Sequence, residues 1–384
     1  MQRKQGKVIF NFLPVRAGGG LQNSLSFLTL LASDMQFNQL SIILCWADSD
    51  IEALCLKKGL KYHSIPYSKV NRLCFEFFGA SKVVKPKDVI FTLFGPPLLR
   101  NYGAKRINGC AYSNLFYPEL DFWGFLRLPS RIIKKVIDFY RKRMLAQSDV
   151  IIFETNSLLQ RAKKDILFKN KDLQLIEMSP SVLVDSKNVR KSVLRDFNSR
   201  LMKDGQIDIL YLSGAHPNKR HFLLPAIIKE LNSINGNYRL ITTLPKSKYL
   251  ERLEAEFHNR DIRECLINLG PISPEDVPSL IEATDCMCNI ALLESFSNNF
   301  VEAWRMSKPL IVTDADWSRA CCSTAAVYID PIDSKKSAIS INRVFSNNAD
   351  LDLLALNGEK QLCNLPSREE RYDMYKNIIL EYLK

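Results

Sequence analysis

Two glutamates separated by seven residues, Glu294 and Glu302, are the carboxylates of this sequence whose setting suggests chemistry. They lie between Cys286 and Asp330, where the residue pattern predicts a strand, a loop, a helix, a second strand and a second helix in that order. Glu294 comes before the loop, and Glu302 lies one turn inside the helix that we expect to begin near Asn298. The two acids therefore flank the beginning of a helix that follows a strand.

The beginning of this helix is suited to an anion, because its first amide groups have no partner within the helix and the helix dipole is positive there. A diphosphate could rest on the amides of the loop from Ser295 to Asn299. Glu302 could then accept hydrogen bonds from ribose hydroxyls, and Glu294 could face a sugar. The alternative is that two glutamates at this spacing are accidental.

This segment resembles the donor-binding segment of family 4 glycosyltransferases, which are retaining enzymes of the GT-B fold. The residues that match the family pattern are Glu294, Phe296, Glu302, Ala303 and Pro309, whereas Ser297 and Ser307 stand where the family usually has glycine. The resemblance implies a donor-binding set of Glu294, Phe296, Ser297, Asn298, Asn299 and Glu302, with Glu294 also catalytic.

A second match to the family follows the predicted strand 209–212. Alignment of Pro217-Asn218-Lys219 places Lys219 on the family's diphosphate-binding lysine, so the resemblance implies a catalytic and donor-binding role for it. Gly214 stands where arginine is usual, and we expect Arg220 or His216 to compensate. His216 is the only histidine that we expect near this site. The alternative for Lys219 is a solvated lysine at the beginning of a helix.

The N-terminal half offers further candidates. The run Gly18-Gly19-Gly20 resembles the family's glycine-rich loop near the donor phosphates, with Gly19 and Gly20 as donor-binding residues, although a triple glycine could also be a simple turn. On the acceptor side the candidates are Gly95, in the segment 94–97, Asn114 and Glu119. No metal and no cofactor is expected. The Asp-x-Asp pairs at 48–50 and 314–316 are interpreted as turns at strand ends.

These residues must be positioned by alternating strands and helices, which the sequence shows throughout and which predict an α/β protein with parallel sheets. We expect a GT-B architecture: two Rossmann-like domains, residues 1–180 on the acceptor side and 205–365 binding the donor, that face each other across a cleft. A final helix in residues 366–384 should pack back on the first domain. A polar segment from about 180 to 206 should form the junction.

The composition, with 46% hydrophobic and 24% charged residues, is that of a globular protein and excludes a coiled coil, collagen or disordered chain. No apolar run is long enough to span a membrane. The N-terminal apolar run contains Asn11 and Pro14 and is interpreted as a strand rather than a signal peptide. The ten cysteines form no Cys-x-x-Cys pair, so we expect reduced thiols in a cytoplasmic protein.

The net charge of +12 is concentrated in residues 1–170, which hold 26 Lys and Arg against 12 Asp and Glu. A basic helix with interleaved apolar residues is predicted there, and it could bind an anionic membrane surface, bind nucleic acid, or be a solvated helix whose apolar stripe faces the core. We favour the membrane and expect no nucleic-acid partner. Its candidate contacts are Trp123, Arg127, Arg131, Lys134, Lys135, Arg141, Lys142 and Arg143.

The resulting expectation is a hexosyltransferase that moves a sugar from a nucleotide diphosphate, with retention, to a lipid-linked oligosaccharide. Such an enzyme would act in the synthesis of O-antigen, capsule or lipopolysaccharide, at the inner face of the cell membrane. The alternatives are another GT-B-like enzyme of nucleotide sugars, such as an epimerase or a phosphorylase, and a non-catalytic basic binding protein.

Overall fold

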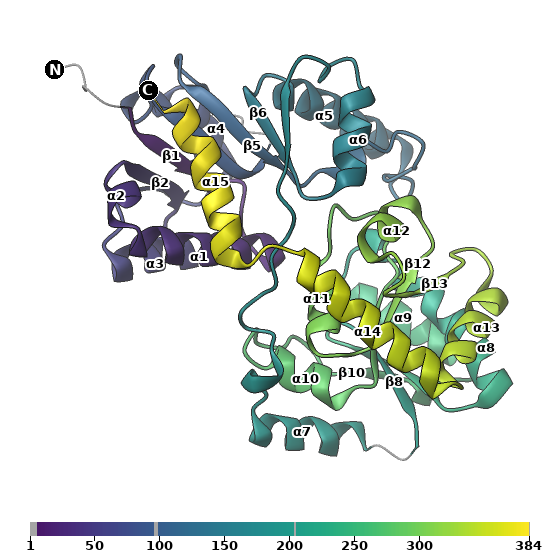
Figure 1. The fold of residues 1–384 in the computed structure, drawn as a ribbon. Helices are drawn as coiled ribbons and strands as arrows, with labels where there is room; N and C mark the ends of the chain where they lie inside the picture. The colour runs from purple at the N-terminus through teal and green to yellow at the C-terminus, as the bar shows by residue number, and fades with distance from the viewer. Residues whose placement is uncertain (1–5, 96–98, 203–204, 384) are drawn as a thin grey trace. The chain divides into compact units, whose positions relative to one another are not determined.

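Two parallel β-sheets, each covered by helices, organise the chain (Figure 1). The structure is a computed structural model that describes residues 6–95, 99–202 and 205–383. Its contacts divide the chain into an N-terminal unit, residues 1–179 together with 366–384, and a C-terminal unit, residues 180–365. The predicted α/β architecture with two parallel sheets is confirmed.

The sheet of the N-terminal unit has seven strands in the order β3-β2-β1-β4-β5-β6-β7, and every neighbouring pair is parallel. Its central strands are almost entirely buried, as their continuous apolar sequences require when helices cover both faces. The strands are β1 (Val8–Asn11), β2 (Ser41–Trp46), β3 (Tyr62–Ile65), β4 (Val89–Gly95), β5 (Lys105–Cys110), β6 (Val150–Phe153) and β7 (Asp172–Leu175).

The helices of this unit pack on both faces of the sheet. Phe27 of α1, Cys55 of α3 and Tyr375 of α15 share one core with β1 and β4, whereas Ala80 and Val84, which follow α4, share a second core on the opposite face. The helices are α1 (Gly18–Ser33), α2 (Met35–Gln39), α3 (Asp50–Lys58), α4 (Lys69–Phe77), α5 (Leu128–Leu145), α6 (Asn156–Lys164) and α15 (Arg368–Tyr382), with short 3-10 helices η1 (Gly79–Lys82) and η2 (Ser113–Leu115).

The C-terminal helix α15 belongs to the N-terminal unit, as predicted (Figure 1). Ser367 and Glu370 form a capping box that fixes where the helix begins. Tyr375 packs edge-on against Phe91 of β4, with ring centroids 5.4 Å apart. Arg371 of α15 also donates to the Glu154 carboxylate over 3.0 Å, and both side chains are less than one tenth exposed. The helix is therefore held by core packing and by a buried ion pair.

The C-terminal unit contains a six-stranded parallel sheet in the order β10-β9-β8-β11-β12-β13. Its strands are β8 (Ile207–Tyr211), β9 (Tyr238–Thr242), β10 (Leu266–Asn268), β11 (Cys286–Asn289), β12 (Leu310–Thr313) and β13 (Val327–Ile329). Its helices are α7 (Lys191–Leu201), α8 (Leu224–Asn235), α9 (Lys248–His258), α10 (Val277–Ala283), α11 (Asn298–Arg305), α12 (Asp316–Cys322), α13 (Ser334–Phe345) and α14 (Asn348–Asn364), with η3 (Ser186–Asn188), η4 (Pro217–Lys219), η5 (His221–Leu223) and η6 (Arg263–Cys265).

The segment expected to be a junction, residues 180–206, contains the helix α7. This helix buries Phe197 and Leu201 and contacts α10, so it is part of the C-terminal unit rather than a linker. Arg190, which precedes it, donates its backbone N–H to the Ser279 hydroxyl over 2.9 Å. Because most residues of α7 are polar, its two buried apolar residues did not indicate a helix in the sequence.

In each sheet the chain reverses its direction of travel across the strands. β8 lies between β9 and β11, so the chain proceeds from β8 toward one edge and then restarts at β11 toward the other. β1 lies likewise between β2 and β4. Loops that leave the carboxyl ends of two such neighbouring strands diverge and open a crevice, which is where ligands bind in open α/β sheets.

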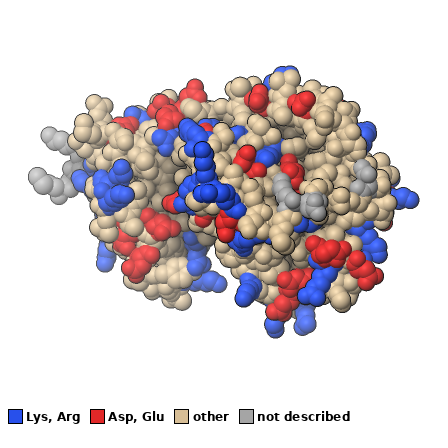
Figure 2. Space-filling view, turned by 90° about the horizontal axis from the view of Figure 1, so that it is seen from below, with Lys and Arg blue, Asp and Glu red and all other residues tan. Residues whose placement is uncertain are grey.

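The net positive charge of the chain is carried by one unit. The N-terminal unit has 31 Lys and Arg against 18 Asp and Glu, whereas the C-terminal unit has 22 against 23. On the face drawn in Figure 2, basic and acidic side chains are interspersed.

All ten cysteines are free thiols, and only Cys74 and Cys363 are exposed. Among the described residues, no helix has the length and apolarity needed to cross a membrane.

Replacing Arg371 by Met tests how α15 is held. The change leaves Glu154 as a buried charge without this partner, so we expect the free energy of unfolding to fall by ~3–5 kcal/mol. Urea denaturation followed by circular dichroism measures the loss. Arg368→Met, at the more exposed pair with Glu369, is the matched control and should change the midpoint little. Equal losses in the two variants would contradict this account.

Candidate functional site

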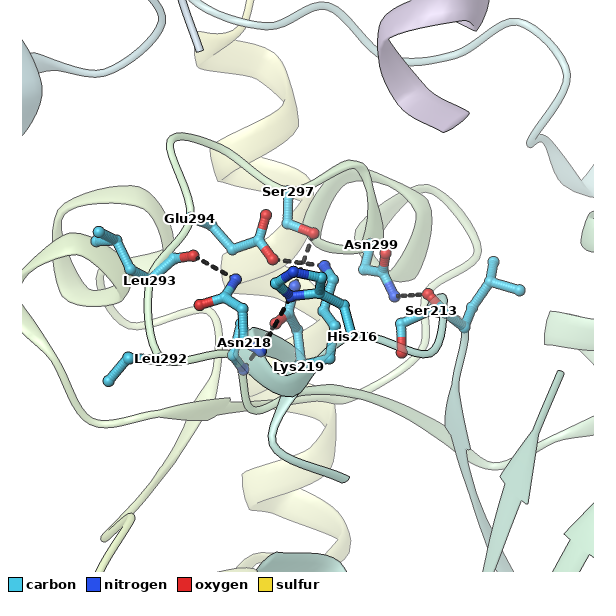
Figure 3. Close-up of polar contacts among 12 residues, drawn as sticks. Ser213, His216, Asn218, Lys219, Leu292, Leu293, Glu294, Ser297 and Asn299 are labelled. Carbon is cyan, nitrogen blue, oxygen red and sulfur yellow. Dashed lines mark hydrogen bonds and ion pairs between the residues drawn. The ribbon is translucent and has the colours of Figure 1, made fainter. Parts of the chain in front are cut away.

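Lys219 and Glu294, which lie 75 residues apart in the sequence, meet at the point where the C-terminal sheet reverses its strand order. Lys219 ends η4 in the connection that follows β8, and Glu294 lies in the loop that follows β11. The Lys219 Nζ lies 2.5 Å from the Glu294 Oε1, and the two side chains are 23% and 17% exposed (Figure 3). The two residues predicted as catalytic therefore form one ion pair at the carboxyl ends of adjacent strands.

Hydrogen bonds to backbone groups hold these two loops together independently of the ion pair. The Leu292 N–H donates to the Asn218 carbonyl oxygen over 2.8 Å, and the Asn218 Nδ2 donates to the Leu293 carbonyl oxygen over 2.9 Å (Figure 3). The Trp317 indole N–H, from α12, donates to the Leu292 carbonyl oxygen over 3.1 Å. These bonds join the residues that precede Lys219 and Glu294, so the position of the ion pair does not depend on the pair alone.

The beginning of α11 has no side-chain cap. Ser297 occupies the N-cap position, but its hydroxyl accepts a hydrogen bond from the Asn289 Nδ2 over 2.7 Å instead of bonding the first helical amides. Asn299 anchors the same turn by donating its Nδ2 to the Leu212 carbonyl oxygen, at the end of β8, over 2.9 Å (Figure 3). The Phe300 N–H donates to the Ser297 carbonyl oxygen over 3.1 Å, which leaves the amides of Asn298 and Asn299 for an anion.

Glu302 is a buried acid one turn inside α11. It is 8% exposed, and burial raises the pKa of its carboxyl to about 7. Among the described residues, no side chain or backbone group is hydrogen-bonded or ion-paired to this carboxylate. A buried acid without a partner is costly in a protein interior, and a ligand that donates hydrogen bonds would reduce this cost.

Aromatic rings support the loop before α11. The ring of Phe296, which is half-buried, lies 5.8 Å from that of Phe300, and Phe300 stacks on Trp317 at 6.2 Å. Asn298, the first residue of α11, is also half-buried. Phe296 thus joins the loop to the core of α11 and α12.

The turn that carries Lys219 has an unusual backbone. The His216 Nδ1 accepts a hydrogen bond from the Asn218 N–H over 3.1 Å, which caps η4. Arg220 then adopts a left-handed conformation with φ of +53°, where a glycine would be favoured. Burial lowers the pKa of the Arg220 guanidinium. His216 and Arg220 thus flank Lys219, and their contact with a donor remains a prediction.

The expectation that His216 is the only histidine near this site was wrong. His221 is fully buried two residues after Lys219, with its Nε2 3.0 Å from the Ser213 hydroxyl and its Nδ1 3.1 Å from the Tyr249 hydroxyl. Burial and the charge of Lys219 lower the pKa of His221 to about 4, so the ring is neutral at physiological pH. Tyr211, which stacks on His221, donates its hydroxyl to the Lys219 carbonyl oxygen over 2.6 Å.

The glycine-rich run of the N-terminal unit forms the first turn of α1 rather than a loop. Gly18, with φ of +67°, begins the helix, and Gly20 faces Phe94 of β4, which a Cβ at this position would approach to 3.6 Å. The helix follows β1, so its glycines lie beside the end of β4, where the N-terminal sheet reverses its order. The donor-binding role of Gly19 and Gly20 remains a prediction.

The acceptor-side candidates have structural partners. Gly95 ends β4 beyond an irregularity in its register with β5. Asn114 donates its Nδ2 to Asp138 over 2.7 Å, and Glu119 pairs with Arg161 over 2.7 Å. Pro96 and Pro97 of the predicted segment lie outside the described residues. These contacts account for Asn114 and Glu119 without a substrate, and their acceptor role remains a prediction.

The predicted basic helix is α5, and it is packed only lightly. Leu145 is its one buried residue, whereas Leu128, Ile133 and Tyr140 are each 60% or more exposed. Asp138 accepts hydrogen bonds from Trp123 Nε1 over 2.6 Å and from Arg141, which ties the aromatic segment to the helix.

The basic side chains of α5 and its N-cap divide into two groups. Arg131, Arg141 and Lys142 form ion pairs with acids of their own unit, and Lys134 lies 4.9 Å from the ring of Trp123. Arg127, Lys135 and Arg143 are exposed and have no acidic partner among the described residues. Exposed apolar and unpaired basic side chains thus alternate along one helix.

Acidic and sulfur ligands do not gather into a metal site in the part of the chain that the structure describes: no group of three or more His, Cys, Asp and Glu side chains could hold an ion. Asp314, in one of the two Asp-x-Asp pairs, binds Arg319 at 2.5 Å. Ser49, in the other, caps α3. The absence of a metal requirement remains a prediction.

Comparisons with known proteins indicate the class of protein. Residues 193–361 match the family described as Glycosyl transferases group 1. This segment includes Lys219, Glu294 and Glu302, and it covers less than half of the chain. No curated protein matches the sequence.

Solved structures resemble the whole chain. A glycosyltransferase from Rickettsia africae aligns with a TM-score of 0.72 at 15% identity over 99% of both chains. A sucrose-phosphate synthase from Thermosynechococcus elongatus aligns with a TM-score of 0.73 at 13% identity over 98% of both. Anabaena HepE, in complex with UDP and glucose, aligns with a TM-score of 0.70 at 13% identity over 98% of this chain and 100% of that one. These likenesses show the GT-B fold, and with the domain match they support a glycosyltransferase enzyme similar to family 4.

The pKa of Glu302 makes a prediction about stability. Because the folded-state pKa of about 7 exceeds the ordinary value of 4.5, folding takes up a proton between these values and stability falls as the pH rises from 4.5 to 7. Glu302→Gln removes this penalty, so at pH 8 we expect the variant to be more stable by as much as ~3 kcal/mol. At pH 5 the variant and the natural protein should be nearly equal. Thermal unfolding at the two pH values measures the difference, and a variant that is less stable at pH 8 would contradict the prediction.

Proposed function

We propose that the chain transfers a hexose-type sugar from a nucleotide-diphosphate donor to a hydroxyl group, with retention at the anomeric carbon. The observation that carries the proposal is the meeting of Lys219 and Glu294 beside the uncapped beginning of α11, with unpartnered Glu302 inside the same helix. At the carboxyl ends of these strands, a cation and free amides suit the diphosphate of such a donor, and a buried acid suits its ribose. UDP and UDP-glucose are bound by the structural neighbour HepE, which supports this donor class.

The proposed reaction breaks the bond between the anomeric carbon and the diphosphate oxygen and forms a bond from that carbon to the acceptor oxygen. The departing diphosphate gains negative charge, which Lys219 and the α11 amides would stabilise. The acceptor proton passes to the departing phosphate, which is the route that the resemblance implies for retention. Glu302 would accept hydrogen bonds from the ribose, and Glu294 would orient the donor sugar.

The ion pair suggests how the donor would enter. Without a ligand, Glu294 already provides the negative partner of Lys219. An incoming diphosphate would take over that partnership, because it offers more charge and more acceptor oxygens than one carboxylate. Glu294 would then be free to accept hydrogen bonds from the sugar hydroxyls. One exchange of partners thus binds the leaving group and prepares the residue that orients the sugar.

We further propose that the acceptor is a lipid-linked saccharide used in surface-polysaccharide synthesis, and that the protein works in the cytoplasm at the inner face of the cell membrane. The support is α5, where exposed apolar residues such as Ile133 and Tyr140 alternate with the unpaired Arg127, Lys135 and Arg143. A helix of this kind binds an anionic bilayer through both area burial and charge.

Substitutions at the ion pair test the activity. We expect Lys219→Ala to lower kcat for transfer or donor hydrolysis about 10²–10³-fold, because charge on the leaving group loses its cation. Glu302→Gln should raise the donor KM more than it lowers kcat. Lys229→Ala, at an exposed lysine of α8, is the control and should keep full activity. A thermal-shift panel of UDP-, GDP-, ADP- and dTDP-sugars identifies the donor. Full activity of Lys219→Ala would contradict the proposal.

Charge reversal on α5 tests the membrane proposal. We expect Lys135→Glu/Arg143→Glu to weaken co-sedimentation with phosphatidylglycerol-containing vesicles, and binding of the natural protein to fall with added salt. Lys335→Glu/Lys336→Glu, on α13, makes the same change in net charge and should leave binding nearly intact. Equal binding to purely neutral phosphatidylcholine vesicles would exclude an electrostatic attachment.

A further inference from the structure

A second exposed apolar surface lies on the N-terminal unit, apart from α5. The α4 surface, as we name it, is made of Val70, Leu73, Phe77 and Phe78, which are 66%, 44%, 44% and 77% exposed. Phe77 and Phe78 are large aromatic side chains, and neither is part of the candidate site or of α5. Side chains of this size are costly in water when they gather in one place, so the α4 surface requires an explanation.

The sequence of α4 separates an inner face from this outer one. Val70, Leu73 and Phe77 follow one another at helical spacing, so they share a stripe. Beside this stripe, Glu76 is fully buried and receives the Arg72 guanidinium over 3.0 Å, and Phe75 stacks on His63. Glu76 is the one buried residue of α4, so these contacts anchor the helix while the stripe stays exposed.

The segment that carries the α4 surface exposes charges of one sign. Between residues 61 and 106 the acids are Glu76 and Asp88, which are 0% and 1% exposed. The exposed charged side chains in the same interval are basic, namely Lys61, Lys69, Lys82, Lys85, Lys87, Arg100 and Lys105, of which Lys105 pairs with Asp149. The segment is thus basic at its surface, and Lys69 and Lys82 lie close in sequence to the two ends of the stripe.

The α4 surface and α5 lie on the same side of the N-terminal sheet. Ala80 and Val84, which follow α4, pack with Ile90, whereas Val89 and Phe91 point to the opposite face with α1 and α15. Val150 and Ile152 also point to that opposite face, so the neighbouring Phe153 points to the α4 side. Phe153 contacts Phe116, whose ring receives Lys142 of α5 at 5.4 Å. Both helices therefore cover the face opposite to α15.

We propose that the α4 surface is a second membrane-docking element, which inserts Val70, Leu73, Phe77 and Phe78 into the interface of an anionic bilayer while Lys69, Lys82 and Lys85 bind lipid phosphates. The inference rests on the proposed function. It adds a second membrane contact, the α4 surface, to the contact proposed for α5 on the same side of the sheet. Two contacts on one rigid face fix the orientation of the unit on the membrane, which one helix does not. A second copy of this chain is disfavoured as the occupant, because its own α4 surface would bring like charges together.

The two exposed cysteines provide a direct test. Cys74 lies on α4, and Cys363 lies on α14 of the C-terminal unit. Cys363→Ser protein labelled at Cys74 with an environment-sensitive fluorophore should show a blue shift with phosphatidylglycerol-containing vesicles and none with phosphatidylcholine vesicles. Cys74→Ser protein labelled at Cys363 is the control and should shift little. No shift at Cys74 in protein that sediments with the anionic vesicles would overturn the proposal.

Substitutions complete the test. We expect Leu73→Ser/Phe78→Ser to weaken binding to anionic vesicles at least about tenfold, because apolar area no longer enters the interface. Leu353→Ser/Leu356→Ser, at exposed leucines of α14, is the matched control and should keep the natural affinity. Both variants should keep the thermal shift produced by the donor sugar. If Leu73→Ser/Phe78→Ser protein binds anionic vesicles as tightly as the natural protein, while donor binding and the effect of the α5 substitutions are intact, this inference alone is overturned. A change of oligomeric state in the same variant would indicate a protein partner and would also overturn it.

Discussion

In a parallel sheet all strands end at one edge, and the order in which the chain visits them decides where that edge can open. In the C-terminal unit β8 and β11 are neighbours from which the chain departs in opposite directions, so the loops bearing Lys219 and Glu294 begin side by side. Hydrogen bonds to backbone groups then hold the two loops together. Because Asn218 bonds both Leu292 and Leu293, the ion pair is organised before any ligand arrives.

The charged groups at the carboxyl ends of β8 and β11 are satisfied to different degrees. Lys219 and Glu294 neutralise each other, whereas Glu302 has no partner among the described residues and its pKa is raised by burial. Burial without a partner lowers stability, and a bound donor that supplies hydroxyl groups would recover part of that loss. His221 shows the opposite arrangement, because both ring nitrogens have partners and the ring stays neutral. Both ring nitrogens of His221 are therefore paired, whereas the Glu302 carboxyl is not.

The sequence predicted much of the architecture because its central strands are continuous apolar runs and its donor segment follows a known pattern. The edge strands β3 and β7 were not predicted, since Tyr62-His63-Ser64-Ile65 and Asp172-Leu173-Gln174-Leu175 are only partly buried and lack such runs. Contacts between connecting segments, such as that of His221 with Ser213 and Tyr249, leave no periodic signal in a sequence.

The placement of α15 has a consequence for the synthesis of the protein. The core formed by β1, β4 and α1 buries Tyr372, Tyr375 and Ile379 of α15. The whole C-terminal unit is translated after α1 and β4 and before α15. Domains usually fold in order as the nascent chain leaves the ribosome. Here the N-terminal unit emerges first, but an apolar face of its core stays uncovered until α15 has been synthesised. The C-terminal unit can therefore complete its fold first, and chaperones can bind the uncovered face in the meantime.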